Sequence, residues 1–191
     1  MKAFIEQAPF VVQSEIGSER DILFEAEEAA PLEERLLQRL EDLPTGGLLV
    51  IDFAGVKVAS EAARQLLRRA CRRITGGELP DRYLVFSHLG RSRYSIEVML
   101  EAEDITVVER GDDDTSATLF GKLEPAMAET YEFVRSRSVA TAKDVFEHFK
   151  LNTISAATNR LTNLAKLALA RRVEEQSVAG GGRQYVYAAV Q

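Results

Sequence analysis

Cysteine, tryptophan and histidine are scarce in this 191-residue chain, which has one, none and two of them respectively. A single cysteine, Cys71, cannot form an intramolecular disulfide, and with His88 and His148 it offers too few ligands for a zinc cage. No run approaches the roughly 18 apolar residues that span a membrane, and the N-terminal residues lack the pattern of a secretory signal peptide. We therefore expect a cytoplasmic chain that binds no metal or cofactor and does not enter a membrane.

Charge is divided unevenly along the chain. Residues 1–121 contain 14 Lys and Arg against 23 Asp and Glu, a formal charge of -9, whereas residues 122–191 contain 10 against 7, a formal charge of +3. Hydrophobic residues make up 46% and charged residues 28%, as in ordinary globular domains. These values predict an acidic domain, 1–121, and a smaller domain, 122–191, that is able to approach a polyanion.

Short apolar runs alternate with amphipathic stretches in the acidic half. The pattern predicts a hairpin over 9–26, a helix opened by Pro31, buried strands at 47–56 and 83–86, helices over 60–74 and 91–104, and a closing hairpin over 105–120. Strands alternating with helices predict an α/β or α+β domain with a mixed, partly parallel sheet. Five arginines between Arg64 and Arg73 share the outer side of one helix, and we interpret them as a solvated face rather than a nucleic-acid site.

Polar loops follow the predicted strands of this half. In open α/β sheets ligands bind outside the carboxyl ends of the strands, and a helix N-terminus there can receive an anion. The candidate ligand or partner residues in these loops are Ser60, Arg91 and Arg93. The alternative is a pair of polar loops without a ligand.

The segment LLVIDFAGVKVASEAARQLL, residues 48–67, is similar to the strand–turn–helix of STAS domains, the anti-sigma-factor-antagonist fold. It is closer still to an uncharacterised STAS-like branch that pairs such a strand with a final hairpin, and the resemblance covers residues 5–121. It implies a sensing or interaction domain. In phosphorylatable members an acidic residue and a Ser or Thr open the helix; the matching places hold Ser60, Glu61 and Ala62, so alanine stands at the acceptor position. Ser60 remains an alternative acceptor, although serine there is also an ordinary helix cap.

The basic half has the order helix, helix, turn, helix, strand, glycine turn, strand. A first helix is predicted over 123–137, and Thr141 with Asp144 forms a capping-box-like start to the second. Thr153 caps a third helix over 154–170, and strands at 171–175 and 183–187 flank Gly180–Gly182.

The stretch TAKDVFEHFKLNTISAATNRLTNLAKLALARR, residues 141–172, resembles the helix-turn-helix of winged-helix transcription regulators of the MarR/ArsR kind. The leucines at the end of the third helix and the pair Arg171 and Arg172 match the passage into the wing, while Ala168 stands where glycine is usual. This resemblance covers residues 125–190. It implies a winged-helix domain that binds double-stranded DNA. Because two copies would double the phosphate contacts, we expect a homodimer as the binding unit.

Helical periodicity divides the third helix into two faces. The predicted inner face comprises Ile154, Ala157, Leu161, Leu164 and Ala168. The predicted DNA-binding residues comprise Ser155, Ala156, Asn159, Thr162 and Asn163 on the outer face, Arg160 and Lys166 at its flanks, and Arg183 at the wing tip. Short amide and hydroxyl groups of this kind fit the major groove, and Asn can pair with adenine.

Two functions remain open. The first is a DNA-binding transcriptional regulator whose N-terminal domain senses a small anionic ligand or a protein partner. The alternative is a protein-interaction module in a partner-switching assembly that does not bind DNA. An enzyme is not expected, because no nucleophile–base order, paired carboxylates or metal spacing stands out.

Overall fold

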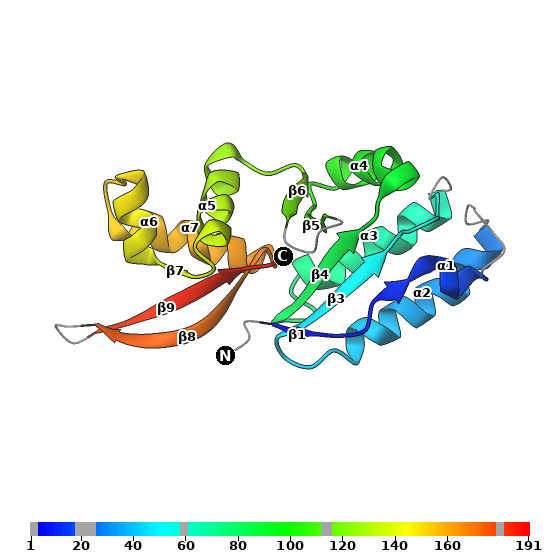
Figure 1. Cartoon of the computed structure of the whole chain (residues 1–191), viewed down its shortest axis with the longest axis horizontal. Coiled ribbons are helices and arrows are strands. Elements are labelled where there is room, and N and C mark those ends of the chain that lie inside the picture. The colour runs from blue at the N-terminus through cyan, green and yellow to red at the C-terminus, as the bar shows by residue number, and fades with distance from the viewer. Residues whose placement is uncertain (1–3, 18–25, 58–60, 112–115, 179–181) are drawn as a thin grey trace. The chain divides into compact units, whose positions relative to one another are not determined.

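The architecture is that of a computed structural model, which describes residues 4–17, 26–57, 61–111, 116–178 and 182–191. The chain divides into two compact units, residues 4–122 and 123–190, which are considered separately (Figure 1). Among the described residues, no helix is both long enough and apolar enough to cross a membrane.

The 4–122 unit is built on one mixed, mostly parallel sheet. Strands β3 (Gly47–Asp52), β4 (Arg82–Ser87) and β5 (Thr106–Arg110) are parallel neighbours, and β6 (Ala117–Gly121) closes the sheet antiparallel to β5. The short strands β1 (Ile5–Glu6) and β2 (Phe10–Val11) both pair with β3 in parallel. This sheet confirms the predicted α/β class.

Helices connect the strands of this sheet. They are α1 (Val12–Ile16), α2 (Ala26–Glu41), α3 (Glu61–Thr75), the 3-10 turn η1 (Gly90–Ser92) and α4 (Arg93–Ala102). Strands β2 to β5 succeed one another in order across the sheet, so right-handed crossovers place α2, α3 and α4 on the same face. The three helices are also neighbours, since α2 contacts α3 and α3 contacts α4.

The predicted hairpin over 9–26 is wrong in its first arm. Phe10 and Val11 pair in parallel with β3, and the chain enters α1 at Val12. Phe10 and Val12 are each only 2% exposed, because pairing with β3 places this segment beside the core. An isolated two-stranded hairpin is only marginally stable and would leave these side chains exposed. The predicted second arm, 22–24, lies outside the described residues.

The helix predicted to open at Pro31 starts earlier, so Pro31 lies inside α2. An interior proline costs about 3 kcal/mol because it lacks the amide proton and its ring crowds the preceding turn. Leu32, Leu36 and Leu40 of the same helix are at most 1% exposed. Burying each of them contributes about 1.5–3 kcal/mol, which together exceeds the cost of the proline.

The arginines of α3 pair with carboxylates of their own unit. Arg69 lies 2.6 Å from Glu33, and Arg73 lies 2.6 Å from Glu41. Arg68 and Arg72 both pair with Glu103. These ion pairs lie within one unit, and exposed pairs of this kind contribute little stability.

The 123–190 unit combines three helices with a three-stranded antiparallel sheet, as the predicted fold class requires. Its elements are α5 (Pro125–Ser136), β7 (Ala140–Thr141), α6 (Ala142–Phe149), α7 (Ile154–Lys166), β8 (Ala170–Val178) and β9 (Gly182–Ala189). Strand β9 lies between β8 and β7. Strand β7 was not predicted, because two residues are too short for an alternating pattern.

A buried core holds the helices of this unit together. Tyr131, Val145, Leu161 and Leu164 are completely buried. The Tyr131 hydroxyl donates a 2.6 Å hydrogen bond to the carbonyl of Val190, and burial raises the pKa of this tyrosine well above its ordinary value. The phenol therefore stays protonated and joins α5 to the residue that follows β9.

Side-chain caps fix where α6 and α7 begin. The Thr141 amide and hydroxyl donate to Asp144 at 2.8 and 2.6 Å, and the Asp144 amide donates back to the Thr141 hydroxyl, which confirms the capping box. Desolvation raises the pKa of Asp144, but the hydrogen bonds from Thr141 and the charges of Arg137 and Lys143 outweigh it and lower the pKa overall. At α7, the Ala156 amide donates to the Thr153 hydroxyl at 3.2 Å, as predicted.

Helix α7 ends in a Schellman motif that contains no glycine. The Leu169 amide donates to the Leu164 carbonyl at 2.9 Å, and the Ala168 amide donates to the Ala165 carbonyl at 3.1 Å. This geometry places Ala168 at a φ of 55°, in the left-handed region that disfavours a Cβ. The helix thus ends at Lys166, earlier than the predicted limit of residue 170.

Replacing Ala168 by glycine should therefore stabilise the 123–190 unit. The gain from relieving the left-handed strain exceeds the entropy that glycine adds to the unfolded chain, so we expect the free energy of unfolding to rise by about 0.5–1 kcal/mol. Ala165→Gly, inside α7, is the matched control and should lower it by about 1 kcal/mol. Thermal unfolding of both variants checks this, and a loss of stability in Ala168→Gly would contradict it.

Candidate nucleic-acid interface and ligand pocket

The outer face of α7 is polar, small and free of carboxylates. Ser155, Asn159 and Asn163 are exposed, while Thr162 and Ala156 are half-buried. The sequence of the helix, ISAATNRLTNLAK, contains no Asp or Glu. The structure therefore brings these five predicted residues together on one helix of 13 residues.

The opposite face of α7 anchors the helix. Ala157, Leu161 and Leu164 are completely buried, as predicted. Ile154 is 49% exposed and Ala168 lies beyond the helix, so both assignments to the inner face are wrong. Ile154 is the first residue of α7, and the buried part of the helix begins one turn later, at Ala157.

The flanking cations differ in their surroundings. Arg160 is half-buried: its Nη1 lies 3.3 Å from the Thr130 hydroxyl, and its guanidinium lies 5.2 Å from the centre of the Phe149 ring. Lys166 is exposed. The side chain of Arg183 lies outside the described residues. Of the two cations whose side chains the structure describes, Lys166 is the better placed for a phosphate.

Strands β8 and β9 form a long two-stranded ribbon that follows α7 (Figure 1). Arg172 stacks on two tyrosines of β9, with its guanidinium carbon 4.5 Å from the ring centre of Tyr185 and 5.8 Å from that of Tyr187. Its Nε also donates to the Tyr187 hydroxyl at 3.1 Å. Cation–π contacts of this kind stiffen the base of the ribbon.

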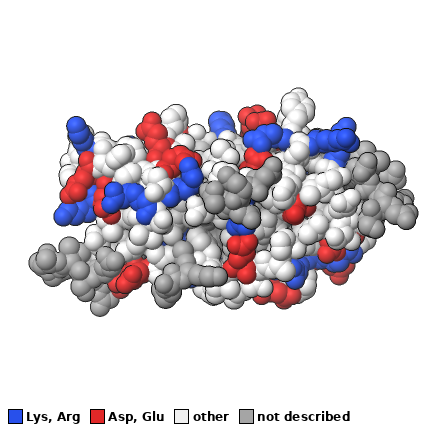
Figure 2. Space-filling model, viewed as in Figure 1, with Lys and Arg blue, Asp and Glu red and all other residues white. Residues whose placement is uncertain are grey.

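Figure 2 shows basic and acidic side chains interspersed on the face that it displays. Lys143, for example, lies 3.7 Å from Glu147 on α6. Binding to a polyanion by such a surface depends on local contacts rather than on a broad positive field.

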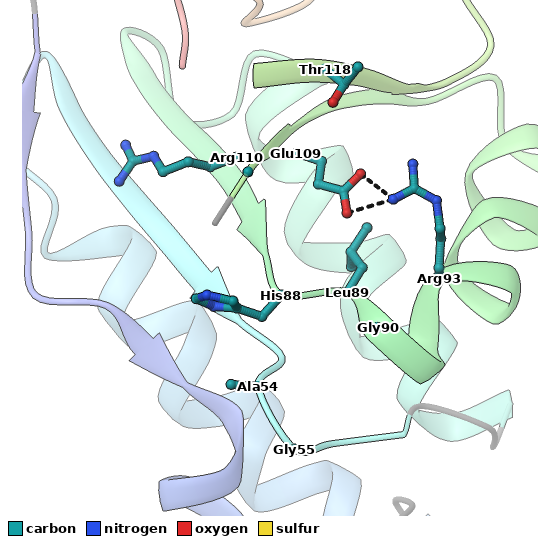
Figure 3. Close-up of a pocket in the computed structure, with 10 residues that line it drawn as sticks. Ala54, Gly55, His88, Leu89, Gly90, Arg93, Glu109, Arg110 and Thr118 are labelled. Atoms are coloured by element: carbon teal, nitrogen blue, oxygen red, sulfur yellow. Dashed lines mark hydrogen bonds and ion pairs between the residues drawn. The ribbon is translucent and has the colours of Figure 1, made fainter. Parts of the chain in front are cut away.

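A pocket of about 590 Å³ lies outside the carboxyl ends of β3, β4 and β5 (Figure 3). Arg93 lines it, and its Nη1 donates to both carboxylate oxygens of Glu109 at 2.7 and 2.5 Å. Arg91 is exposed on η1 and is not among the residues that line the pocket. Ser60 lies outside the described residues. The structure thus places one of the three predicted ligand residues at this pocket.

A histidine–aspartate pair stands at the same edge. The His88 Nδ1 lies 2.8 Å from Asp52 Oδ1, and the same oxygen accepts the Ala54 amide at 2.8 Å. The second contact makes Asp52 a turn cap, as expected for a strand-end aspartate. His88 has a φ of 52°, so its backbone is left-handed where the chain leaves β4.

Sequence reasoning missed His88, Glu109 and Thr118 as residues of one pocket. Asp52 and Ser87 are partners in the parallel register, which places His88 one residue beyond that edge. Glu109 and Thr118 are antiparallel partners. Aligning the ends of the predicted strands would have brought His88 to Asp52, whereas the Glu109–Thr118 pair requires the register of the final hairpin.

Two further results concern metal and redox chemistry. No group of three or more His, Cys, Asp or Glu within the described ranges is placed to hold a metal ion.

Cys71 is 1% exposed, and desolvation raises the pKa of its thiol to about 12. A thiol in this state is unreactive at neutral pH.

The fold and these sites define a two-part protein: an α/β unit with a mostly parallel sheet and a pocket at its carboxyl edge, and a helical unit with a three-stranded antiparallel sheet. The chain matches no protein-family model, no curated protein sequence and no solved structure.

Proposed function

We propose that the protein is a DNA-binding transcriptional regulator in which a winged helix-turn-helix of the MarR/ArsR kind, residues 122–191, reads duplex DNA through α7. The STAS-like unit, residues 1–121, is the sensing part. The observation that carries the proposal is the carboxylate-free outer face of α7, on which Asn159 and Asn163 are exposed.

The dimensions of this face suit the major groove. An α-helix fits the groove, and its exposed side chains meet the base edges. Asn159 and Asn163 are four residues apart and share one side of α7, so both amides can approach neighbouring bases. Ser155 lies a further turn toward the N-terminus of the helix, where a hydroxyl can contact either a base or a phosphate.

Phosphate contacts complete the interface. Lys166 is exposed in the last turn of α7, and Lys150 is exposed at the end of α6. These cations are few, so one copy of the unit makes few phosphate contacts. Two copies double that number, which favours a homodimer as the binding unit.

Titration of the full chain with labelled duplexes, selected from a random-sequence pool, tests the proposal. We expect the logarithm of affinity to fall linearly with the logarithm of salt concentration, and Lys166→Ala to reduce that slope by about one. Lys57→Ala, which removes an exposed lysine from the 4–122 unit, is the matched control and should leave the slope unchanged. Failure to recover any bound duplex would overturn the proposal in favour of a protein-interaction module.

A further inference from the structure

We propose that the outer side of α4 is a self-association surface, on which two copies of the chain pair through antiparallel α4 helices. The surface, the α4 stripe, consists of Arg91, Tyr94, Val98 and Glu101. It gives a seam to the homodimer that DNA binding favours, yet it stands whether or not the chain binds DNA.

Helix α4 has one buried side and one open side. Ile96, Met99 and Leu100 are at most 2% exposed and lie in the core of the unit. On the opposite side Tyr94 is 78% exposed and Val98 is 47% exposed, and no other large hydrophobic residue in the described part of the chain is as exposed as Tyr94. A single exposed hydrophobic residue is ordinary, whereas neighbouring ones form a patch of the kind that marks a contact site.

The α4 stripe is continuous along the helix. Tyr94, Val98 and Glu101 lie within about 60° of one another around the helix axis at 3.6 residues per turn. The 3-10 turn η1 leads directly into α4, and side chains three residues apart are aligned in such a turn. Arg91 is therefore in line with Tyr94.

The two ends of the stripe carry opposite charges that the unit itself does not use. Arg91 and Glu101 are exposed, and neither makes a hydrogen bond or an ion pair with the described residues. By contrast, the nearby Arg93 pairs with Glu109, and Glu103 pairs with two arginines of α3. The stripe thus offers a cation at one end and a carboxylate at the other to a partner.

The order of the four residues is symmetric about Ile96. Tyr94 and Val98 lie two positions to either side of it, and Arg91 and Glu101 lie five positions to either side. A two-fold axis through this point pairs two antiparallel copies, so Tyr94 meets the partner's Val98 and Val98 meets the partner's Tyr94. Arg91 likewise meets the partner's Glu101 at both ends. The stripe is therefore self-complementary, whereas a parallel pair would set like charges opposite one another.

The charges on and beside the stripe argue against a nucleic acid or an anionic membrane as its occupant. Glu101 lies on the stripe, and Glu97 is half-buried on its flank. Both carboxylates repel phosphate groups. A second copy instead pairs Glu101 with Arg91 and leaves Glu97 at the rim, where salt screens its charge.

Analytical ultracentrifugation of the full chain, without DNA and from micromolar to millimolar concentrations, tests the proposal. We expect a monomer–dimer equilibrium with a dissociation constant in the micromolar range, because a pair of helices of 10 residues buries less than the roughly 800 Å² per partner of a standard interface. Tyr94→Ala should weaken dimerisation by about tenfold or more, since it removes a tyrosine from the centre of the interface. Tyr185→Ala, at an exposed tyrosine of the 123–190 unit, is the matched control and should leave the equilibrium unchanged.

An exchange of charges distinguishes a lost contact from a lost fold. Arg91→Glu and Glu101→Arg each set like charges opposite one another at both ends of the pair, so each should weaken dimerisation by about tenfold. An equimolar mixture of the two variants restores opposite charges at both ends and should recover the dimer. Lys57→Glu and Glu34→Arg, at exposed positions outside the stripe, are the matched controls and should have no effect.

Three results would each overturn the proposal: a chain that stays monomeric at millimolar concentration, charge variants that dimerise as tightly as the unmodified chain, or a mixture of the two that stays monomeric. Affinity for duplex DNA is measured in a separate titration. Failure of the α4 seam and failure of DNA binding are therefore distinguishable.

Discussion

Replacing Asn159 and Asn163 together by aspartate should reduce the affinity for the selected duplexes by at least about thirtyfold, since each lost amide–base contact costs about 1–3 kcal/mol. The change keeps the shape of both side chains and places two carboxylates on a face that has none. Both positions are exposed, so the helix and its buried anchors remain. Fluorescence anisotropy of labelled duplex measures the effect, with circular dichroism to verify that the helices persist.

The matched control for added negative charge is Gln38→Glu. This residue is exposed on α2 in the other unit, and the substitution is the same change of amide to carboxylate. If net charge alone governed binding, the control would lose affinity in proportion to its one added charge; we expect less than a twofold change. Equal affinities for the double aspartate variant and the unmodified chain would contradict a role for α7 in DNA binding.

Gly121→Ala should lower the free energy of unfolding of the 4–122 unit by about 3 kcal/mol. Gly121 ends β6 with a φ of 109°, and a Cβ built there would lie 2.3 Å from the Ile105 carbonyl oxygen. No flexible side chain can move to relieve this contact, because the atoms that it meets belong to the backbone of Ile105 and Thr106. The β5–β6 ladder must therefore shift.

The Gly77→Ala variant measures the cost of backbone strain at a glycine where an added Cβ causes no steric clash. Gly77 also has a positive φ, 79°, but an added Cβ there has no heavy atom within 4 Å. It should cost about 1 kcal/mol from backbone strain alone. Urea denaturation gives both values, and hydrogen exchange at the amides of β5 and β6 assigns the Gly121 loss to that ladder. If both variants lowered the free energy of unfolding by the same amount, the predicted effect of the steric clash at Gly121 would be contradicted.

The capping residues of the 123–190 unit were predictable because they act over three or four residues. Thr141 with Asp144, and Thr153, close hydrogen bonds to amides three residues along the chain, so the sequence signal and the contact coincide. The buried positions of α7 follow from periodicity for the same reason. Ile154 departed from that pattern because periodicity gives the direction of a side chain and not the depth of the core under it.

The N-terminal strands and the pocket were not predictable to the same degree. Phe10 and Val11 pair with β3, whose residues lie some forty positions further along the chain, and no local pattern identifies that partner. The pocket likewise joins residues from β5, β6, α4 and the loops after β3 and β4. Arg93 was predicted because it follows a strand, whereas Glu109 and Thr118 depend on strand register, which a shift of one residue would reverse.

The buried thiol of Cys71 makes the native chain a convenient background for site-directed labelling. The only cysteine of the sequence is hidden in the core, and its high pKa keeps it protonated at neutral pH. A maleimide probe therefore discriminates between Cys71 and a cysteine introduced at an exposed position. One dye on α7 and another on α4 would then report the separation of the two units in solution, with and without a duplex.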